Sequence, residues 1–164
     1  MPGDPSWHIP GGRHPQEPHV SSRQFVTFEV AGQFFGVDVD AVQEVLSYSE
    51  YTPVPLAPNA VGGLFNLRGQ VIAAVDLRVQ FGLPRRDMSG LVMNVIVRYG
   101  DEPVSLLVDR IGQVADLDAK LFEEPPATLT GPSRALVTGA YKTEGRLLLV
   151  LDVAECVNTA RVLA

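Results

Sequence analysis

The 164-residue sequence predicts a mainly β protein made of two small five-stranded units, with short helices and a C-terminal helix. Two observations predict this fold class. Alternating β-branched and aromatic residues are interrupted by glycine turns, which is typical of hairpins. The pattern of one half of the chain also recurs in the other half, which indicates an internal duplication. Each unit is too small to form a large core alone, so we expect the two to pack together, each closing into a barrel that hides its edges.

Four hairpins follow one another along the chain. The first has its strands at residues 25–30 and 34–39, around Ala31-Gly32. The others are predicted at residues 62–77 with Arg68-Gly69 at the tip, at 91–108 around Gly100-Asp101, and at 136–151. Prolines divide residues 53–58 into extended pieces, and three prolines with a glycine make 125–133 a loop.

Three aspartates stand where a helix is expected to begin, since Asp is a favoured N-cap. Asp40 precedes apolar residues at helical spacing, which predicts one or two turns over residues 41–45. Asp76 is expected to cap a short helix that ends at Phe81, before Gly82 and Pro84. Asp152 begins an amphipathic helix that runs to Ala160, with Cys156 packed near its apolar side.

The duplication is visible when the sequence is shifted against itself. A shift of 76 residues aligns Gly63 with Gly139, and Val75-Asp76-Leu77 with Leu151-Asp152-Val153. A shift of 69 residues aligns the earlier halves, with Asp40, Val42 and Val45 meeting Asp109, Ile111 and Val114. Arg68 aligns with Glu144 at the equivalent hairpin tip. Shared positions should serve the fold, and positions that differ are where function can enter.

Residues 1–22 are predicted to form a disordered tail, and residues 23–160 one folded domain. Residues 1–20 hold five of the 13 prolines, three glycines and all three histidines, with no apolar periodicity. Such a segment buries too little apolar surface to offset the entropy lost on ordering. The histidines are loosely spaced and have no Cys or acidic partner at a ligand interval, so a solvated tail is favoured over a metal site.

Composition excludes several classes of protein. The longest apolar runs are five residues, Val71–Val75 and Leu147–Leu151, whereas a membrane helix needs about 20. No secretory signal pattern is present, and the single cysteine fits a reducing compartment. A net charge of −6 and a single adjacent basic pair argue against binding to nucleic acid.

No catalytic set can be assembled from the predicted domain. Residues 21–164 contain no histidine, which removes Ser–His and Cys–His pairs. Phosphate-binding loops and zinc or iron ligand sets are missing as well, so no cofactor and no metal are expected. Paired carboxylates leave a glycosidase-like hydrolase open, although caps and solvated turns explain them better. These pairs are Asp38/Asp40, Asp101/Glu102, Asp116/Asp118 and Glu123/Glu124. A scaffold or binding module remains.

The signature stretches of the sequence resemble the CheW family, the coupling proteins of bacterial chemotaxis. The resemblance covers residues 23 to about 160, and its most specific part is the run G-x-x-N-L-R-G at residues 63–69, followed by Asp76-Leu77-Arg78. It implies two packed, SH3-like five-stranded barrels around a shared core. It also implies a non-catalytic, cytoplasmic adaptor in a two-component signalling array.

The family's partners are implied by the same resemblance. One surface would bind the regulatory domain of the histidine kinase CheA, and another the cytoplasmic tip of a methyl-accepting receptor, with no nucleic acid and no membrane insertion. Glu44 and Arg68 match signature positions that should lie close together and serve receptor coupling, or form a structural ion pair. Five further residues match positions near the receptor-facing groove, with a core role as the alternative: Val39, Val42, Val45, Val71 and Ile111.

A second class of function stays open on the sequence alone. A small barrel of this kind could instead bind another ligand, such as a peptide or an oligosaccharide. Co-purification with a histidine kinase would separate the two.

Overall fold

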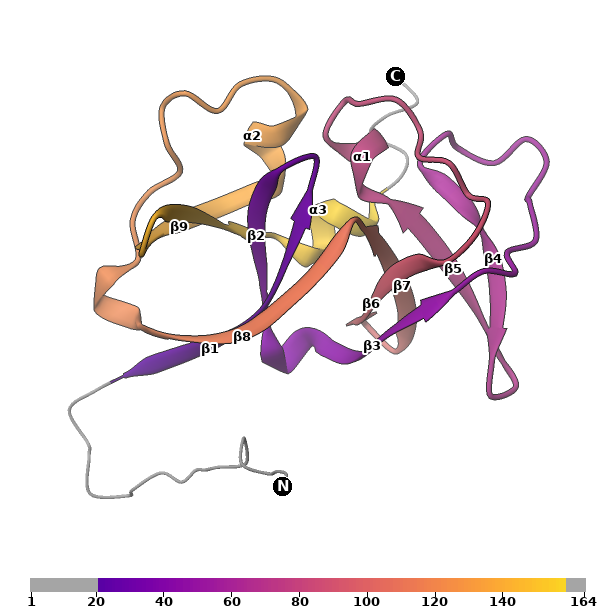
Figure 1. Ribbon diagram of the computed structural model, residues 1–164, viewed down its shortest axis with the longest axis horizontal. Helices are drawn as coiled ribbons and strands as arrows, with labels where there is room; N and C mark the ends of the chain where they lie inside the picture. Colours follow the sequence, from indigo (N-terminus) through magenta and orange to yellow (C-terminus); the bar gives the residue numbers. More distant parts are fainter. Residues whose placement is uncertain (1–20, 159–164) are drawn as a thin grey trace.

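The computed structural model describes residues 21–158, which form two five-stranded sheets (Figure 1). The terminal sheet, which holds both ends of the described chain, has the order β8-β1-β2-β10-β9. Its strands are β1 (Ser22–Val30), β2 (Gln33–Asp38), β8 (Arg110–Asp118), β9 (Val137–Thr143) and β10 (Arg146–Leu151). The central sheet has the order β3-β6-β7-β5-β4. Its strands are β3 (Val42–Tyr48), β4 (Val61–Leu67), β5 (Gln70–Asp76), β6 (Val92–Tyr99) and β7 (Glu102–Val108). The predicted fold class is confirmed.

All four predicted hairpins are present as antiparallel pairs: β1–β2, β4–β5, β6–β7 and β9–β10. Two predicted capping aspartates are confirmed too. Asp76 caps α1 (Leu77–Gln80) and Asp152 caps α3 (Val153–Val157), each accepting a backbone N–H near the start of its helix. The end of the predicted C-terminal helix and residues 1–20 of the predicted tail lie outside the described residues, so the tail stays a prediction.

The helix predicted over residues 41–45 is wrong. Asp38 caps a single 3-10 turn, η1 (Val39–Ala41), and the chain then enters β3, which pairs with β6. Partly buried and exposed residues alternate along β3, so its true period is two. The helical spacing spanned only five residues, too short a pattern to compete with pairing along a neighbouring strand. The aligned segment of the other repeat, β8, is likewise a strand, at one edge of the terminal sheet.

The predicted duplication is visible in the order of elements, but the two repeats exchange strands. The first repeat runs from β1 to β5 and α1, and the second from β6 to β10 and α3. Each sheet takes two strands from one repeat and three from the other. The second shift places β3 on β8, and the first places β4 on β9, so equivalent strands occupy equivalent places in the two sheets.

Each sheet is closed by one bridge between its two ends. Beyond β3, Thr52 exchanges two backbone hydrogen bonds with Leu64 of β4, at 2.7 and 2.8 Å. Beyond β8 and the 3-10 turn η2 (Ala119–Leu121), Glu123 pairs in the same way with Ala140 of β9, at 2.8 and 2.9 Å. The two ends of each strand order are thereby joined, as the barrel prediction requires.

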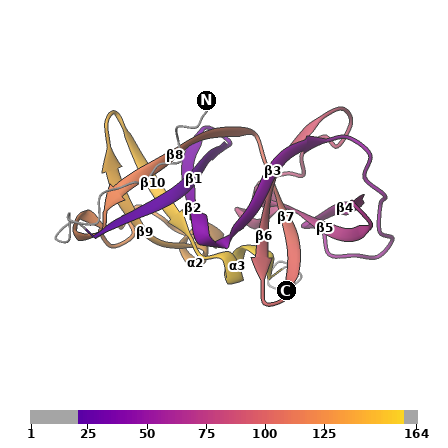
Figure 2. The same cartoon turned by 90° about the horizontal axis from the view of Figure 1, so that it is seen from below.

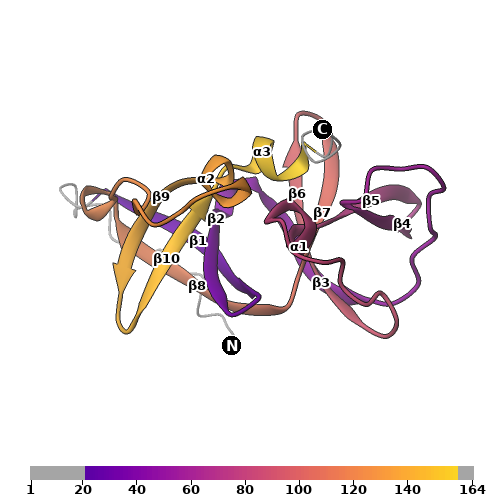
Figure 3. The same ribbon diagram turned by 90° about the horizontal axis from the view of Figure 1, so that it is seen from above.

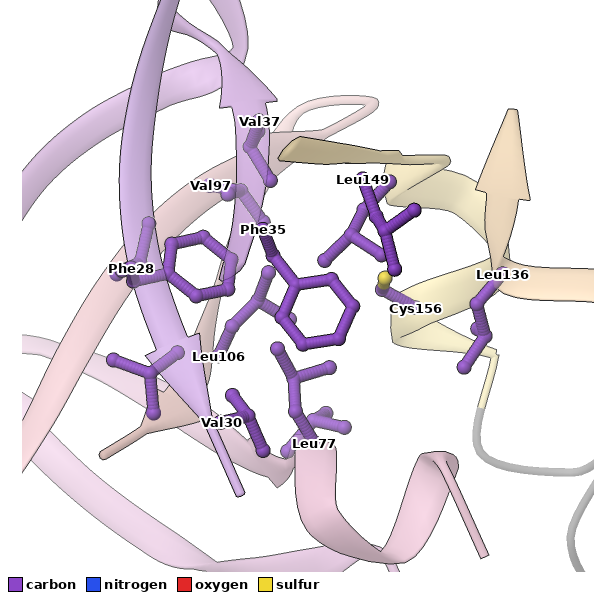
Figure 4. Close-up of a cluster of buried hydrophobic side chains, with 14 of the residues drawn as sticks. Phe28, Val30, Phe35, Val37, Leu77, Val97, Leu106, Leu136, Leu149 and Cys156 are labelled. Carbon is purple, nitrogen blue, oxygen red and sulfur yellow. The ribbon is translucent and has the colours of Figure 1, made fainter. Parts of the chain in front are cut away.

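The largest buried cluster lies between the two sheets. Figure 4 shows Phe28 and Phe35 of the terminal sheet gathered with Leu106 of the central sheet, and Cys156 of α3 beside them. Cys156 is fully buried, which confirms its predicted packing. The helices complete this shared core: α3 follows a strand of the terminal sheet and packs against β6 and β7 of the central sheet (Figures 2 and 3). A third short helix, α2 (Pro132–Leu136), packs on α3 and β9.

Candidate partner-binding surface

Glu44 and Arg68 form an ion pair across the central sheet. Glu44 lies on β3, and Arg68 lies at the tip of the β4–β5 hairpin, where its φ of +53° places it in the left-handed region. The Asn66 side chain accepts the N–H of Gly69 at 2.9 Å, which holds this turn. The Arg68 Nη2 donates to the Glu44 Oε2. Because β3 and β4 are the two ends of the strand order, the pair joins both edges of the sheet.

The ion pair is solvated on the arginine side. The side chain of Arg68 is 67% exposed and that of Glu44 28%. An ion pair of this exposure contributes about 0–1 kcal/mol to stability. The equivalent positions of the terminal sheet hold Gln113 and Glu144, which cannot form an ion pair with each other. The fold can therefore be built without this contact, which belongs to one sheet only.

Two exposed valines belong to the same strands as the ion pair. Val45 follows Glu44 on β3, and Val71 lies on β5 opposite Asn66. Their exposures, 42% and 62%, are high for apolar side chains on paired strands. Their repeat equivalents on the terminal sheet, Val114 and Leu147, are also exposed, at 56% and 40%. The duplication thus gives each sheet an equivalent pair of exposed apolar residues.

The remaining predicted residues lie where the chain crosses between the sheets. Val39 is half-buried in η1, which links β2 to β3. Val42, at the start of β3, and Ile111, at the start of β8, are both partly buried and pack against the shared core. The structure therefore divides the seven predicted residues into two groups, one around the ion pair and one at the crossovers.

A polar cluster at the second crossover was not predicted from the sequence. The chain leaves β7 of the central sheet at Val108 and enters β8 of the terminal sheet at Arg110, so Asp109 alone separates the two strands. Its carboxylate accepts hydrogen bonds from the Ala31 N–H at 2.7 Å and from Arg78 Nη2 at 2.7 Å. Arg86 Nη1 donates to the same carboxylate at 2.8 Å. Asp109 is thus held from both sheets.

Arg86 is the most buried member of this cluster. Its side chain is 9% exposed, and that of its partner Asp76 is 1% exposed. Arg86 Nε donates to Asp76 at 2.9 Å, and its terminal nitrogens reach the carbonyl oxygens of Leu107 and Val108, each at 3.1 Å. Two signals pointed to the cluster: the Asp76-Leu77-Arg78 run, and the adjacent pair Arg85-Arg86.

The charge environment perturbs the pKa of Asp109. Burial acts to raise the pKa, but the Ala31 amide, the Arg78 hydrogen bond and the positive charges of Arg86 and Arg78 outweigh it. The pKa of the Asp109 carboxyl is therefore held below its ordinary value. The carboxylate stays ionised at neutral pH and keeps its partners.

The described residues offer little material for other chemistry. No group of three or more His, Cys, Asp or Glu side chains among residues 21–158 is placed to hold a metal ion. Within the same range, no helix is long and apolar enough to cross a membrane. Two of the carboxylate pairs contain structural caps, since Asp38 and Asp118 accept the N–H groups of Asp40 and Lys120.

Comparison with known proteins gives a consistent result. The family described as the CheW-like domain matches residues 24–161. A chemotaxis protein CheW of Thermotoga maritima is 31% identical over 138 residues, covering 82% of this chain and 87% of that protein. The CheW of Treponema pallidum is 29% identical over 154 residues, covering 90% of this chain and 91% of that protein. The crystal structure of the scaffolding protein TtCheW from Thermoanaerobacter tengcongensis superposes with a TM-score of 0.72 at 30% identity, covering 80% of this chain and 90% of that one.

Proposed function

The chain belongs to the CheW family of chemotaxis coupling proteins, and we propose that it links methyl-accepting receptors to the histidine kinase CheA as a non-catalytic, cytoplasmic adaptor. The match over the whole folded region carries this proposal. Nothing in the comparisons supports the alternative of a barrel that binds an unrelated peptide or an oligosaccharide.

We propose that the receptor's cytoplasmic tip binds on the central sheet and the crossovers. The residues that would contact it are Val39, Val42, Glu44, Val45, Arg68, Val71 and Ile111. Receptor tips of this class are coiled coils, and helices dock through apolar side chains set in a groove. The exposed Val45 and Val71 beside the Glu44–Arg68 pair offer apolar contact next to a fixed charge, which supports this assignment.

The regulatory domain of CheA would then bind on another face. That domain is itself expected to be CheW-like, so a barrel-against-barrel contact is the natural form of the interface. The exposed Val114 and Leu147 on the terminal sheet support this placement, because they repeat the apolar pair of the central sheet on a separate sheet. Lys and Arg number only 13 in the chain, and we expect apolar contact to dominate.

Reconstitution tests the adaptor function directly. Receptor signalling fragments assembled on vesicles and purified CheA from the same organism would be mixed with and without this protein, and CheA autophosphorylation measured. We expect the kinase to become receptor-controlled only when the adaptor is present. Kinase activity that responds to receptor equally well without the adaptor would contradict the proposal.

A further inference from the structure

The Asp109 cluster connects the two sheets at the point where the chain passes from one to the other. Its members from the central side are Arg78 of α1, Asp76 at the end of β5, and Arg86 in the segment that follows α1. From the terminal side, the Ala31 N–H bonds the Asp109 carboxylate, and the Asp109 N–H donates to the Glu29 carbonyl of β1 at 2.9 Å. One residue therefore receives contacts from both bodies.

The turn that Asp109 holds is strained. Ala31 has a φ of +53°, a left-handed conformation that side chains other than Gly, Asn and Asp adopt rarely. Such backbone persists only where the surroundings fix it. The Ala31 amide bond to Asp109 is one such constraint, so the β1–β2 turn of the terminal sheet is anchored on a carboxylate that the central sheet's arginines orient.

The first crossover lacks this arrangement, although it is the repeat equivalent of the second. There, η1 links β2 to β3, and Asp40, the counterpart of Asp109, donates its backbone N–H to the neighbouring Asp38. Asp38 is paired with Arg23 of its own sheet at 3.5 Å, with both side chains over a third exposed. The arginine-bound carboxylate is thus a feature of one crossover only, which indicates that the fold itself does not require it.

We propose that Arg86 and Arg78, acting through Asp109, position β8 relative to the central sheet and so hold Val42 and Ile111 in one coupling surface. This inference rests on the receptor-binding role proposed above for those two residues. Ile111 lies two residues beyond Asp109, so a rotation at Asp109 displaces it directly. Arg86 suits the task because its planar guanidinium donates in several fixed directions at once, to Asp76, Asp109 and two β7 carbonyls. These arginines are positioning residues and need not touch the partner.

The test measures orientation and coupling separately on the full chain. Spin labels at the exposed, repeat-equivalent positions Ser47 of β3 and Asp116 of β8 report the distance between the two sheets by pulsed electron resonance. The native Cys156 is fully buried, which directs labelling to the two introduced cysteines. The variants are Asp109→Asn, Arg78→Gln and Arg86→Lys. Arg146→Gln is the matched control, because its ion pair with Glu29 at 3.0 Å is partly exposed and stays within the terminal sheet.

We expect one narrow distance for the wild type and for Arg146→Gln, and a broadened or shifted distance for the three variants. Receptor-dependent CheA activation should fall by about tenfold in Asp109→Asn, which corresponds to about 1.4 kcal/mol, while CheA binding stays within about twofold. Arg86→Lys keeps the charge and loses the fork, so it should lose coupling as well. If Arg86→Lys fails to fold because Asp76 is left buried and poorly paired, the more exposed Arg78 and Asp109 still decide the question.

Two outcomes overturn the inference while the proposed function stands. Lost coupling with an unchanged distance distribution would mean that these residues act by direct contact with a partner. A broadened distribution with full coupling would mean that orientation does not matter. Failure of the wild-type protein to confer receptor control on CheA would instead overturn the proposed function itself.

Discussion

Gly63 and Gly139 occupy equivalent positions in the two sheets, each directly beneath the residue that closes its barrel. A Cβ on Gly63 would lie 3.0 Å from the Tyr51 Cβ and 3.1 Å from the Thr52 oxygen. A Cβ on Gly139 would lie 2.6 Å from the Glu123 oxygen and would also strike the Phe122 ring. Because Thr52 and Glu123 are the closing residues, both glycines leave room for the chain to cross the strand and join the two ends of the sheet.

Gly139→Ala should therefore loosen the terminal barrel. Its backbone is not in the left-handed region, so the effect is steric, and overpacking of this kind costs about 1–3 kcal/mol. Thermal unfolding should show a Tm lower by about 5 °C. The control Lys142→Ala lies on the same strand and removes only an exposed 3.8 Å ion pair, so its Tm should stay close to wild type. An unchanged Tm in Gly139→Ala would mean that the Phe122 segment moves aside freely.

Arg68→Glu should separate stability from coupling. It places two like charges together at Glu44, in an exposed setting where the ion pair contributes only about 0–1 kcal/mol. We expect nearly wild-type thermal stability, retained CheA binding and weakened receptor coupling in the reconstituted assay. The double variant Glu44→Arg with Arg68→Glu should regain part of the coupling, because it restores opposite charges. Purely additive losses in the double variant would argue against a direct role of the pair, and collapse of stability in Arg68→Glu would make it structural.

Val71→Glu and Leu147→Glu form a matched pair, since the two positions are repeat equivalents with exposed apolar side chains. The first should weaken receptor coupling and spare CheA binding, whereas the second should weaken CheA binding. A charge buried without a partner at an interface costs several kcal/mol, so either loss should exceed about tenfold in affinity. Titration of CheA and of receptor arrays against both variants measures the two effects. Equal effects of both variants on both partners would contradict the assignment of separate faces.

The contribution of Asp109 to stability should depend on pH. Its folded pKa lies below its ordinary value, so the carboxylate contributes stability that is complete above the unfolded pKa and is lost as the pH falls through the folded pKa. In urea unfolding, the wild type should exceed Asp109→Asn most at neutral pH, and the difference should shrink below about pH 4. A difference that stays constant from pH 7 to acid would show that charge plays no part in the cluster.

Deletion of residues 1–20 should leave Tm within a few degrees of wild type, a change of about 1 kcal/mol or less. The reason is compositional, since this segment has five prolines and no apolar pattern with which to pack. Differential scanning calorimetry of the shortened and full-length chains measures the effect. A much larger loss would mean that these residues pack on the terminal sheet.

The sequence by itself determined the hairpins, two of the predicted helix caps and the duplication, because each depends on residues close together in the chain. Glycine at a turn, alternation along a strand and Asp before a helix are local physical preferences, and β4–β5 with α1 and β9–β10 with α3 follow them in both repeats. The signature stretch also indicated Glu44 and Arg68 as a pair. Local pattern failed at Asp40, where helical spacing over five residues lost to strand pairing with β6.

Only the tertiary structure decided how the repeats share strands, which residues close each barrel, and where the charges meet. The exchange between repeats joins β2 to β10 and β5 to β7, partners that no local signal connects. The cluster around Asp109 unites Ala31, Arg78 and Arg86, up to 78 residues apart in sequence. Each contact is favourable only once both sheets are in place, because desolvating an arginine or a carboxylate is offset by partners that the fold alone supplies.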